Sequence, residues 1–254
     1  MIISSLENPQ VKRIIKLKKS KERKKSNSFV VEGEREIKIA LKSGLEIEYF
    51  YVCEEYTKNK KSNLKIDYYF EKNVFDKISK RENPDGYIAI FKGKKKSLND
   101  LKLSENPLIF ILDSIEKPGN LGAIARTADA ASVDVIFLIN PQVDIYNPNA
   151  IRTSQGTIFS TPILVVGREE VLTFCKEKGV KIIATSPRSE KVYTNQNFKS
   201  GSAILLGAED KGLSEDWLEL ADERVKIEMR GKIDSLNLSV STAIIAFEAL
   251  RQRE

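Results

Sequence analysis

Residues 108–139 have the sequence LIFILDSIEKPGNLGAIARTADAASVDVIFLI, and this stretch decides the fold class. It holds two short apolar runs, LIFILD (108–113) and VDVIFLI (133–139), with a helical pattern between them. An unbroken apolar run of this length is typical of a strand buried on both faces, and such strands belong to parallel sheets covered by helices. The stretch therefore predicts a strand, a helix and a second, parallel strand.

The rest of the second half repeats this pattern. Further apolar runs are PILVVG (162–167), VKIIAT (180–185) and SAILLGAE (202–209), and helical stretches such as REEVLTFCKEKG (168–179) separate them. Strands joined in this way form a parallel α/β sheet with crossover helices. The chain closes with SLNLSVSTAIIAFEALRQR, from Ser235, whose apolar residues cover nearly all faces of a helix. We expect that helix to be buried against the sheet or against a second subunit.

The first half predicts a smaller α/β layer fold. Strand and helix patterns alternate there, and the segments are SFVVEG (28–33), EREIKIALKSG (34–44), IEYFYVCE (47–54), KIDYYF (65–70) and GYIAIFKG (86–93). The segment KGKKKSLNDLKLSENP (92–107) is poor in apolar residues and ends at a proline, as linkers do. We therefore predict a first domain at residues 1–95, a linker at 96–106 and a second domain at 107–254.

Composition excludes several classes of protein. Of the 254 residues, only Cys53 and Cys175 are cysteines, and there is no histidine, so neither a disulfide framework nor the usual zinc sites are expected. No apolar stretch approaches the roughly 20 residues that span a bilayer. The composition predicts a cytoplasmic protein with no metal and no membrane segment.

The positive charge is concentrated in the first half. Residues 1–104 carry 25 Lys and Arg against 15 Asp and Glu, whereas the remainder carries 17 against 21. Pro9 can open an amphipathic helix there, and KRIIKLKKSKERKK (12–25) is dense enough in charge to favour RNA, although a merely solvated surface is the alternative. The candidate RNA-binding residues are Lys12, Arg13, Lys16, Lys18, Lys19, Lys24 and Lys25.

The familiar catalytic schemes are missing. Without histidine there is no Ser-His pair or histidine base, and neither a P-loop nor a GxGxxG fingerprint follows any predicted strand. That leaves the loops at strand ends, where α/β folds bind ligands. Three such segments stand out: DSIEKPGNLGAIARTADA (113–130), LLGAEDKGLS (205–214) and VKIEMRGKIDSLNLSVS (225–241).

Each loop has a feature suited to a site, and each also fits an ordinary turn or cap. Asn120 suits the N-cap of a helix that contains Arg126. Gly207 permits close backbone approach at a strand end, and Gly212 suits the following turn. In the third segment a strand is expected to pass through a turn at Gly231 directly into a helix capped near Ser235.

Together, in this order and spacing, the three segments resemble the signature motifs of the SpoU (TrmH-type) family of RNA 2′-O-methyltransferases. The first half, with SLENPQVKRIIKL and FVVEGEREIKIAL, is similar to the L30e-like substrate-binding domain of many members. The resemblance implies methylation of a ribose 2′-hydroxyl by S-adenosylmethionine. It also implies a trefoil knot formed by the segments around Gly207 and 227–236, and a homodimer.

The resemblance also implies which residues form the site. Arg126 would bind an RNA phosphate, because guanidinium stays protonated and offers a planar fork of donors. The polar positions that match the family's active site are Arg126, Asn120, Glu209, Ser235 and Asn237. The positions that match its cofactor site are Thr185, Gly207, Ile227, Met229 and Leu236.

One residue departs from the family pattern, and some alternatives stay open. Glu228 stands where the family usually has a proline before Met229, so the turn could lose stiffness and gain charge. A non-catalytic RNA-binding protein of the same fold is one alternative, and a nucleotide-dependent α/β enzyme is another. Ribosomal RNA, 23S in particular, is the preferred substrate and tRNA the second choice.

Overall fold

The structure is a computed structural model that describes residues 1–58 and 62–254. Its contacts divide the chain into two compact units. The first comprises Met1–Lys95 together with Tyr146–Ser160, and the second comprises Lys96–Ile145 together with Thr161–Glu254.

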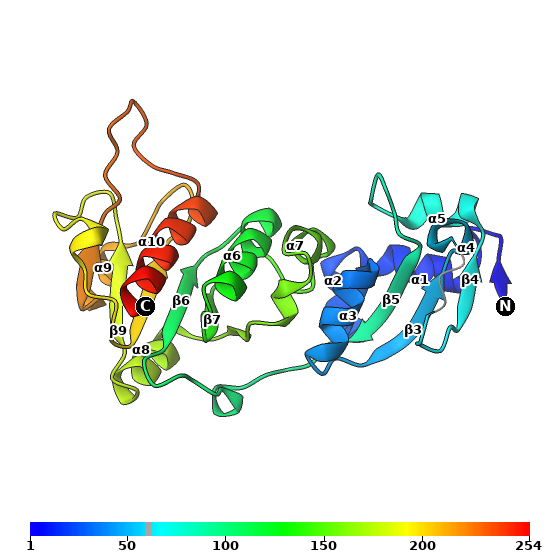
Figure 1. Ribbon diagram of the computed structural model, residues 1–254, viewed down its shortest axis with the longest axis horizontal. Helices are drawn as coiled ribbons and strands as arrows, with labels where there is room; N and C mark the ends of the chain where they lie inside the picture. The colour runs from blue at the N-terminus through cyan, green and yellow to red at the C-terminus, as the bar shows by residue number, and fades with distance from the viewer. Residues whose placement is uncertain (59–61) are drawn as a thin grey trace. The chain divides into compact units, whose positions relative to one another are not determined.

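The first unit is built on a mixed sheet of five strands in the order β1-β4-β3-β5-β2. Figure 1 labels β3, β4 and β5 of this sheet. Strand β5 runs antiparallel to β2 and β3, while β4 runs parallel to β1 and β3. This confirms the predicted α/β layer fold. The strands are β1 (Ile2–Ile3), β2 (Ser28–Glu32), β3 (Ile47–Val52), β4 (Tyr68–Phe70) and β5 (Tyr87–Lys92). The helices are α1 (Pro9–Leu17), α2 (Ser20–Ser26), α3 (Glu34–Lys42), α4 (Glu54–Thr57) and α5 (Lys72–Ile78).

Helix α1 forms as its sequence predicts. Asn8 caps it by accepting a hydrogen bond from the Gln10 amide at 2.8 Å, and Pro9 occupies the first helical position, where no backbone donor is needed. Every third or fourth residue (Val11, Ile14 and Leu17) is buried, and the basic residues between them lie outside the core. The basic run is not one helix, because the chain turns at residues 18–19 before α2 begins.

A segment from between two strands of the second sheet packs in the first unit. Helix α7 (Pro148–Thr153) and the single turn η2 (Thr157–Phe159) lie against β2 and α3. The ring of Tyr146 stacks on Phe29 with centroids 4.0 Å apart. Gly156, at φ +88°, approaches α3 so closely that a Cβ would lie 3.0 Å from the Glu36 α carbon. The domain division predicted from the sequence did not place this segment in the first unit, and that division stays a prediction.

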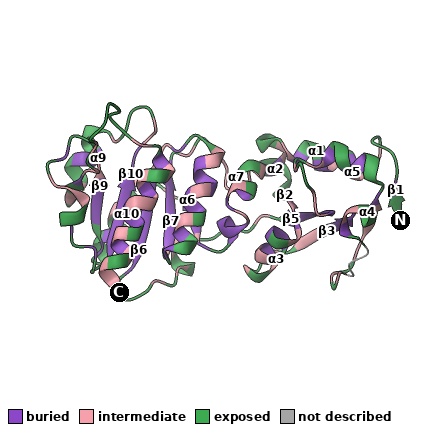
Figure 2. Cartoon of the chain, turned by 45° about the horizontal axis from the view of Figure 1, so that its top comes forward, coloured by how far each residue is buried: buried purple, intermediate pink, exposed green. Residues whose placement is uncertain are grey.

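The second unit is built on a fully parallel sheet of six strands in the order β11-β9-β10-β6-β7-β8. Strands β6, β7 and β10 are buried along nearly their whole length (Figure 2), which confirms the predicted parallel sheet. The strands are β6 (Leu108–Asp113), β7 (Val135–Ile139), β8 (Ile163–Val165), β9 (Lys181–Thr185), β10 (Ser202–Leu206) and β11 (Glu223–Val225). The helices are α6 (Pro118–Ala130), α8 (Arg168–Glu177), α9 (Glu215–Leu220) and α10 (Leu238–Arg253), with single turns η1 (Leu98–Asp100) and η3 (Tyr193–Asn195).

The chain returns from the sheet edge at its C-terminal end. Strand β11 is an edge strand next to β9, yet α10 packs against α6, which follows β6 on the other side of β10. The connection is the orange loop that leads into α10 (Figure 1), and it has no regular secondary structure from residue 227 to residue 237. A knotted chain requires a return of this kind. The threading itself stays a prediction.

Two helix starts differ from the predictions. Helix α10 begins at Leu238 and not at Ser235, because the Asn237 side chain accepts the Ser239 amide at 2.9 Å and so caps the helix. Helix α6 begins at Pro118 with Lys117 in the N-cap position, so Asn120 lies in the first turn and is not the cap. Proline fixes its own φ at the helical value and sets the start of α6 three residues earlier than a cap at Asn120 would.

Candidate active site

A cavity of about 790 Å³ lies at the carboxyl ends of β9, β10 and β11 in the second unit. Its wall is formed by the loop after β10 (residues 206–215) and by residues 225–241, with Thr185 at the end of β9. Parallel sheets bind ligands at this edge. The five predicted cofactor positions all line it: Thr185, Gly207, Ile227, Met229 and Leu236.

Two glycines shape the loop after β10. A Cβ on Gly207 would lie 2.2 Å from the carbonyl carbon of Gly212, so only glycine allows the loop to fold back on itself here. Gly212 has φ +66°, and its amide donates to the Ala208 carbonyl at 2.9 Å. This confirms the close backbone approach and the turn predicted for these two positions. The loop continues into α9, where the Trp217 indole donates to Asp113 at 2.9 Å and ties α9 to the end of β6.

The three sequence motifs meet in one chain of hydrogen bonds, which we name the polar relay. Asn237 donates through its amide nitrogen to the Asn120 side-chain oxygen at 3.2 Å. Asn120, which is buried, donates in turn to one carboxylate oxygen of Glu209, and Lys117 pairs with the other. The same pairing raises the pKa of Lys117, first through its hydrogen bond to the carboxylate. Motifs far apart in the sequence are thereby held together.

The relay fixes the orientation of both amides. The Asn237 oxygen accepts the Ser239 amide and hydroxyl, at 2.9 and 2.7 Å, so its nitrogen must face Asn120. Asn120 then presents its oxygen to Asn237 and its nitrogen to the Glu209 carboxylate, which is acceptor-only when ionised. Each partner thus selects the orientation of the next. The arrangement holds polar groups at set positions, as a site that positions a substrate requires.

The remaining predicted active-site residues lie outside the relay. Arg126 is exposed on α6 and makes neither a hydrogen bond nor an ion pair with any residue the structure describes. Glu209 was expected to hold Asn120 or Arg126, and in the structure it contacts Asn120. Ser235 is exposed in the loop before α10 and lines the cavity. Lys117 was missed, because no motif marks a surface lysine whose partner is 92 residues away.

Comparison with known proteins identifies the family. Residues 107–247 match the SpoU rRNA Methylase family, and residues 8–89 match the MRM3-like substrate binding domain. The chain belongs to the SpoU rRNA methylase family. It is therefore an S-adenosylmethionine-dependent RNA 2′-O-methyltransferase, so the predicted family, α/β fold class, enzyme class and cofactor are confirmed.

Three relatives illustrate the range of the SpoU family. The Bacillus subtilis 23S rRNA (guanosine(2553)-2′-O)-methyltransferase RlmP is 29% identical over 96% of this chain and 97% of its own. The structure of AdoMet-bound rRNA methyltransferase from Sinorhizobium meliloti is 30% identical, has a TM-score of 0.88 and covers 99% of this chain and 97% of its own. The Thermus thermophilus tRNA (guanosine(18)-2′-O)-methyltransferase is 37% identical over 60% of this chain and 79% of its own.

The cavity of this SpoU protein fits S-adenosylmethionine in its polarity. Leu206, Ile227 and Leu236 give it apolar wall, while the 207–212 loop offers backbone groups to an adenine. Its charged lining consists of four carboxylates and two basic side chains, and one of those, Arg188, already pairs with Glu215 at 3.3 Å. An excess of carboxylates suits the positive sulfonium. Glu228 is exposed and is not part of the lining, so its charge does not enter the cavity.

The described part of the chain offers neither an activated cysteine nor a metal site. Cys53 and Cys175 are buried, and burial raises the pKa of their thiols to about 11 and about 12, so neither is an activated nucleophile. Residues 1–58 and 62–254 contain no group of three or more acidic, cysteine or histidine side chains that could hold a metal ion. In the same residues, no helix has the length and apolar character to cross a membrane.

The structure divides the predicted RNA-binding residues into two groups. Three already have partners within the chain: Lys12 pairs with Glu7, Arg13 with Glu48 at 2.6 Å, and Lys18 donates to the Ile78 carbonyl at 2.8 Å. The other four are exposed and make no hydrogen bond or ion pair with the described residues; they are Lys16, Lys19, Lys24 and Lys25. Arg23, in the same run, is buried and donates to the carbonyls of Leu17 and Lys18, which is a structural role.

Proposed function

We propose that this protein methylates one ribose 2′-hydroxyl of 23S ribosomal RNA. The observation that carries the proposal is the site itself. All five cofactor positions expected from the motifs line one cavity, and three of the five polar positions join in a relay in the same unit. An intact relay also argues against a non-catalytic protein of the same fold, since nothing in RNA binding alone requires the three motifs to be linked.

The cavity residues hold the methyl donor. S-adenosylmethionine would supply a methyl group on a positively charged sulfur, and transfer of that methyl to the ribose would leave a neutral thioether and release the proton of the 2′-hydroxyl. Gly207 and its loop contribute backbone groups, Ile227, Met229 and Leu236 contribute apolar contact, and Thr185 closes the end of β9. The Thr185 hydroxyl already donates to the Leu205 carbonyl at 3.1 Å, so its part is to form wall.

The polar residues position the RNA. Arg126 has no partner among the described residues, so its planar fork of donors is free for the phosphate beside the target ribose. Asn120 and Asn237 orient the ribose, Glu209 keeps Asn120 in place, and Ser235 contacts the substrate at the mouth of the cavity. Holding the 2′-oxygen in line with the methyl group is the main contribution, because correct orientation alone removes much of the barrier to a two-reactant step.

Ribosomal RNA is favoured over tRNA by the extent of the matches. The Bacillus subtilis 23S rRNA enzyme aligns with nearly the whole chain, including the substrate-binding part, whereas the Thermus thermophilus tRNA enzyme aligns with 60% of it. The four exposed lysines of residues 12–25 provide charge for the phosphate backbone. A cytoplasmic location follows from this substrate.

We further propose that the protein acts as a homodimer joined through α10. One face of this helix is buried and the helix packs against α6, whereas the face of Val240, Ile244 and Phe247 is not buried. Val240 and Phe247 are 46% and 48% exposed, one above the other two turns apart. An uncovered apolar stripe on an ordered helix is typical of an interface.

The test is transfer of labelled methyl from S-adenosylmethionine to total RNA from cells that lack the protein, followed by mapping of the modified nucleotide. Incorporation at one ribose of 23S RNA is the expected result. Incorporation into tRNA would replace the substrate and keep the reaction. A chain that binds neither S-adenosylmethionine nor RNA would refute the proposal, and binding of RNA alone would favour a non-catalytic protein.

A further inference from the structure

A second cavity lies in the first unit and is lined by four basic side chains. It measures about 130 Å³, which has room for several waters and hence for a phosphate group. Its apolar wall includes Val30 and Ile88 from the sheet and Ile151 from α7. The basic side chains come from three parts of the chain, and we name their site the basic pocket; they are Lys18, Lys80, Arg81 and Arg152.

Three of the four basic groups have no carboxylate partner within the described residues. Lys18 donates to the Ile78 carbonyl at 2.8 Å, and Arg152 donates to the Asn149 side-chain oxygen at 2.8 Å and more weakly to the Lys80 carbonyl. The Lys80 amine makes no hydrogen bond or ion pair with a described residue. Other basic groups of this unit, such as Lys38 and Lys72, pair with an acid one helical turn away.

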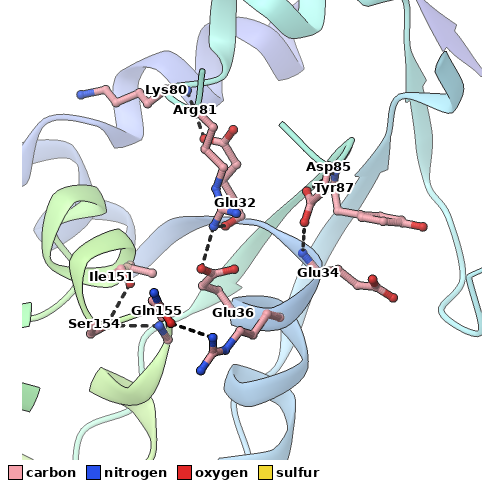
Figure 3. Close-up of polar contacts among 12 residues, drawn as sticks. Glu32, Glu34, Glu36, Lys80, Arg81, Asp85, Tyr87, Ile151, Ser154 and Gln155 are labelled. Carbon is pink, nitrogen blue, oxygen red and sulfur yellow. Dashed lines mark hydrogen bonds and ion pairs between the residues drawn. The ribbon is translucent and has the colours of Figure 1, made fainter. Parts of the chain in front are cut away.

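The fourth basic group is fixed in place. Arg81 donates to the Glu32 carbonyl at 2.7 Å and pairs with Glu36 at 2.7 Å, and Figure 3 shows these two contacts side by side. Glu36 is buried and its second carboxylate oxygen has no hydrogen-bond partner, so Arg81 is the group that balances its charge. Arg81 therefore contributes a rigid edge, while its charge is largely balanced.

One acidic side chain lines the pocket, and its donors are neutral. The Glu32 carboxylate accepts the Ser79 hydroxyl and the Lys80 amide. Counting Glu32 against Lys18, Lys80 and Arg152, the pocket keeps an excess of positive charge. Burial, and then repulsion from Lys80, lowers the pKa of Lys18, and attraction to Glu32 opposes this only in part, which agrees with an excess of positive charge in the pocket.

We propose that the basic pocket binds a phosphate of the RNA backbone, which makes it a second point of substrate contact besides the active site. This inference rests on the proposed function. A phosphate would supply the anion that Lys18, Lys80 and Arg152 lack, and charge-assisted hydrogen bonds to phosphate are among the strong ones. Lys18 belongs to the basic run of residues 12–25, so the pocket continues a surface already suited to a polyanion.

The pocket also has a consequence for the segment that contains α7. Arg152 and Asn149 belong to this segment, which enters the chain between β7 and β8 of the catalytic sheet, whereas Lys18 and Lys80 belong to the substrate-binding part. One bound phosphate would contact both the α7 segment and the rest of the first unit. RNA capture would then stabilise the packing of the α7 segment on β2 and α3.

The test compares two double variants of the full chain that lose equal charge. K80Q/R152Q removes two basic groups of the pocket, and K42Q/K72Q removes two from α3 and α5 outside it. Binding of 23S rRNA transcript is measured by filter binding across a series of KCl concentrations. At low salt the pocket variant should bind the transcript about tenfold more weakly than the control variant, because it loses its charge-assisted contacts to the phosphate. Its slope of log affinity against log salt should be smaller by about 0.7 to 0.9, the contribution of one neutralised phosphate.

Two further measurements separate charge from structure and RNA from free anion. The charge-retaining variant K80R/R152K should keep affinity within about threefold of wild type, and K80Q alone, which removes no intramolecular contact, should give an intermediate loss. Broadening of the phosphorus resonance of inorganic phosphate reports whether a free ion occupies the pocket.

Each contrary outcome counts against a specific claim. Equal affinity of K80Q/R152Q and K42Q/K72Q would overturn the RNA contact, and phosphate broadening that only K80Q/R152Q abolishes would then assign the pocket to a free ion. Loss of affinity in K80R/R152K as well would mean a structural role. These results leave methyl transfer by the wild-type chain untouched, whereas failure of the wild type to bind or methylate RNA is a failure of the proposed function.

Discussion

Arg126 differs from the residues of the polar relay because it makes no hydrogen bond or ion pair with another residue of the described chain. It is exposed and unpaired, so Arg126→Ala should change the free energy of unfolding by less than about 0.5 kcal/mol. Methyl transfer should fall by about a hundredfold or more, because phosphate positioning is lost, while S-adenosylmethionine affinity stays the same. Single-turnover transfer and calorimetric titration with the cofactor measure the two effects.

Arg126→Lys is the control for this prediction. It keeps the charge but loses the planar fork, so it should recover only part of the rate. Full activity of Arg126→Ala would remove this residue from the mechanism.

Asn120 should behave in the opposite way, because it is buried and in the middle of the polar relay. Asn120→Ala leaves the Asn237 amide and one Glu209 oxygen without a partner, at a cost of about 1 to 3 kcal/mol in folding stability. Activity should fall along with stability. Thermal unfolding and transfer rates test this against Asn99→Ala, an exposed asparagine of the same unit that should change little. Wild-type stability of Asn120→Ala would mean that the relay contributes nothing to the fold.

At the residue scale, the motifs predicted which side chains gather but not how they pair. Asn120, Glu209 and Asn237 were named from the sequence, and the structure brings them together. The sequence offered Ser235 as the cap of the last helix and Asn120 as a cap of α6, since both residue types suit that role. The capping residues are set by contacts the sequence does not display: Asn237 caps α10 while it also reaches Asn120, and Pro118 starts α6.

The loop after β10 is the element on which the cavity depends. Gly207→Ala would place a Cβ 2.2 Å from the Gly212 carbonyl carbon, and backbone cannot move aside as a flexible side chain can. We expect a loss of about 1 to 3 kcal/mol in stability and at least a tenfold weaker S-adenosylmethionine affinity, because the loop is displaced into the cavity. Calorimetric titration and thermal unfolding measure both.

Gly231→Ala, in the loop between β11 and α10, is the matched control. No heavy atom lies within 4 Å of its added Cβ, so both quantities should stay near wild type. A Gly207→Ala protein with normal cofactor affinity would show that the loop can open without harm to the site.

At the element scale, predictability followed the strength of the apolar pattern. Strands β6 and β10 are buried on both faces, so their unbroken apolar runs located them closely. KIDYYF (65–70) was harder, and only Tyr68–Phe70 form β4, since the Asp67 carboxylate accepts the Phe50 amide beside it. The packing of the α7 segment on the first unit could not be predicted, because it depends on contacts such as Tyr146 on Phe29, more than a hundred residues away in sequence.

For the whole molecule, the sequence predicted where the basic residues lie, but not which of them have partners inside the chain. The basic excess of the first half includes Arg13, Lys12 and Arg23, which have partners inside the chain. The basic pocket brings Lys18 together with Lys80 and Arg152, which are themselves 72 residues apart. No sequence pattern linked these three residues. Charge density thus points to a polyanion, and only the fold distinguishes structural cations from available ones.

The proposed dimer gives the last prediction, and α10 is the element that tests it. If the stripe of Val240, Ile244 and Phe247 is covered by a second copy, Phe247→Asp places a charge in an apolar interface. The wild-type chain should then be a dimer by analytical ultracentrifugation, and the dissociation constant of Phe247→Asp should rise about a hundredfold or more, since an uncompensated charge in such an interface costs about 3 kcal/mol. Leu220→Asp, at an equally exposed leucine on α9, controls for the added charge and should leave the dimer intact. A monomeric wild type would refute the dimer, whereas a Phe247→Asp protein that dimerises as tightly as wild type would place the interface away from this stripe of α10.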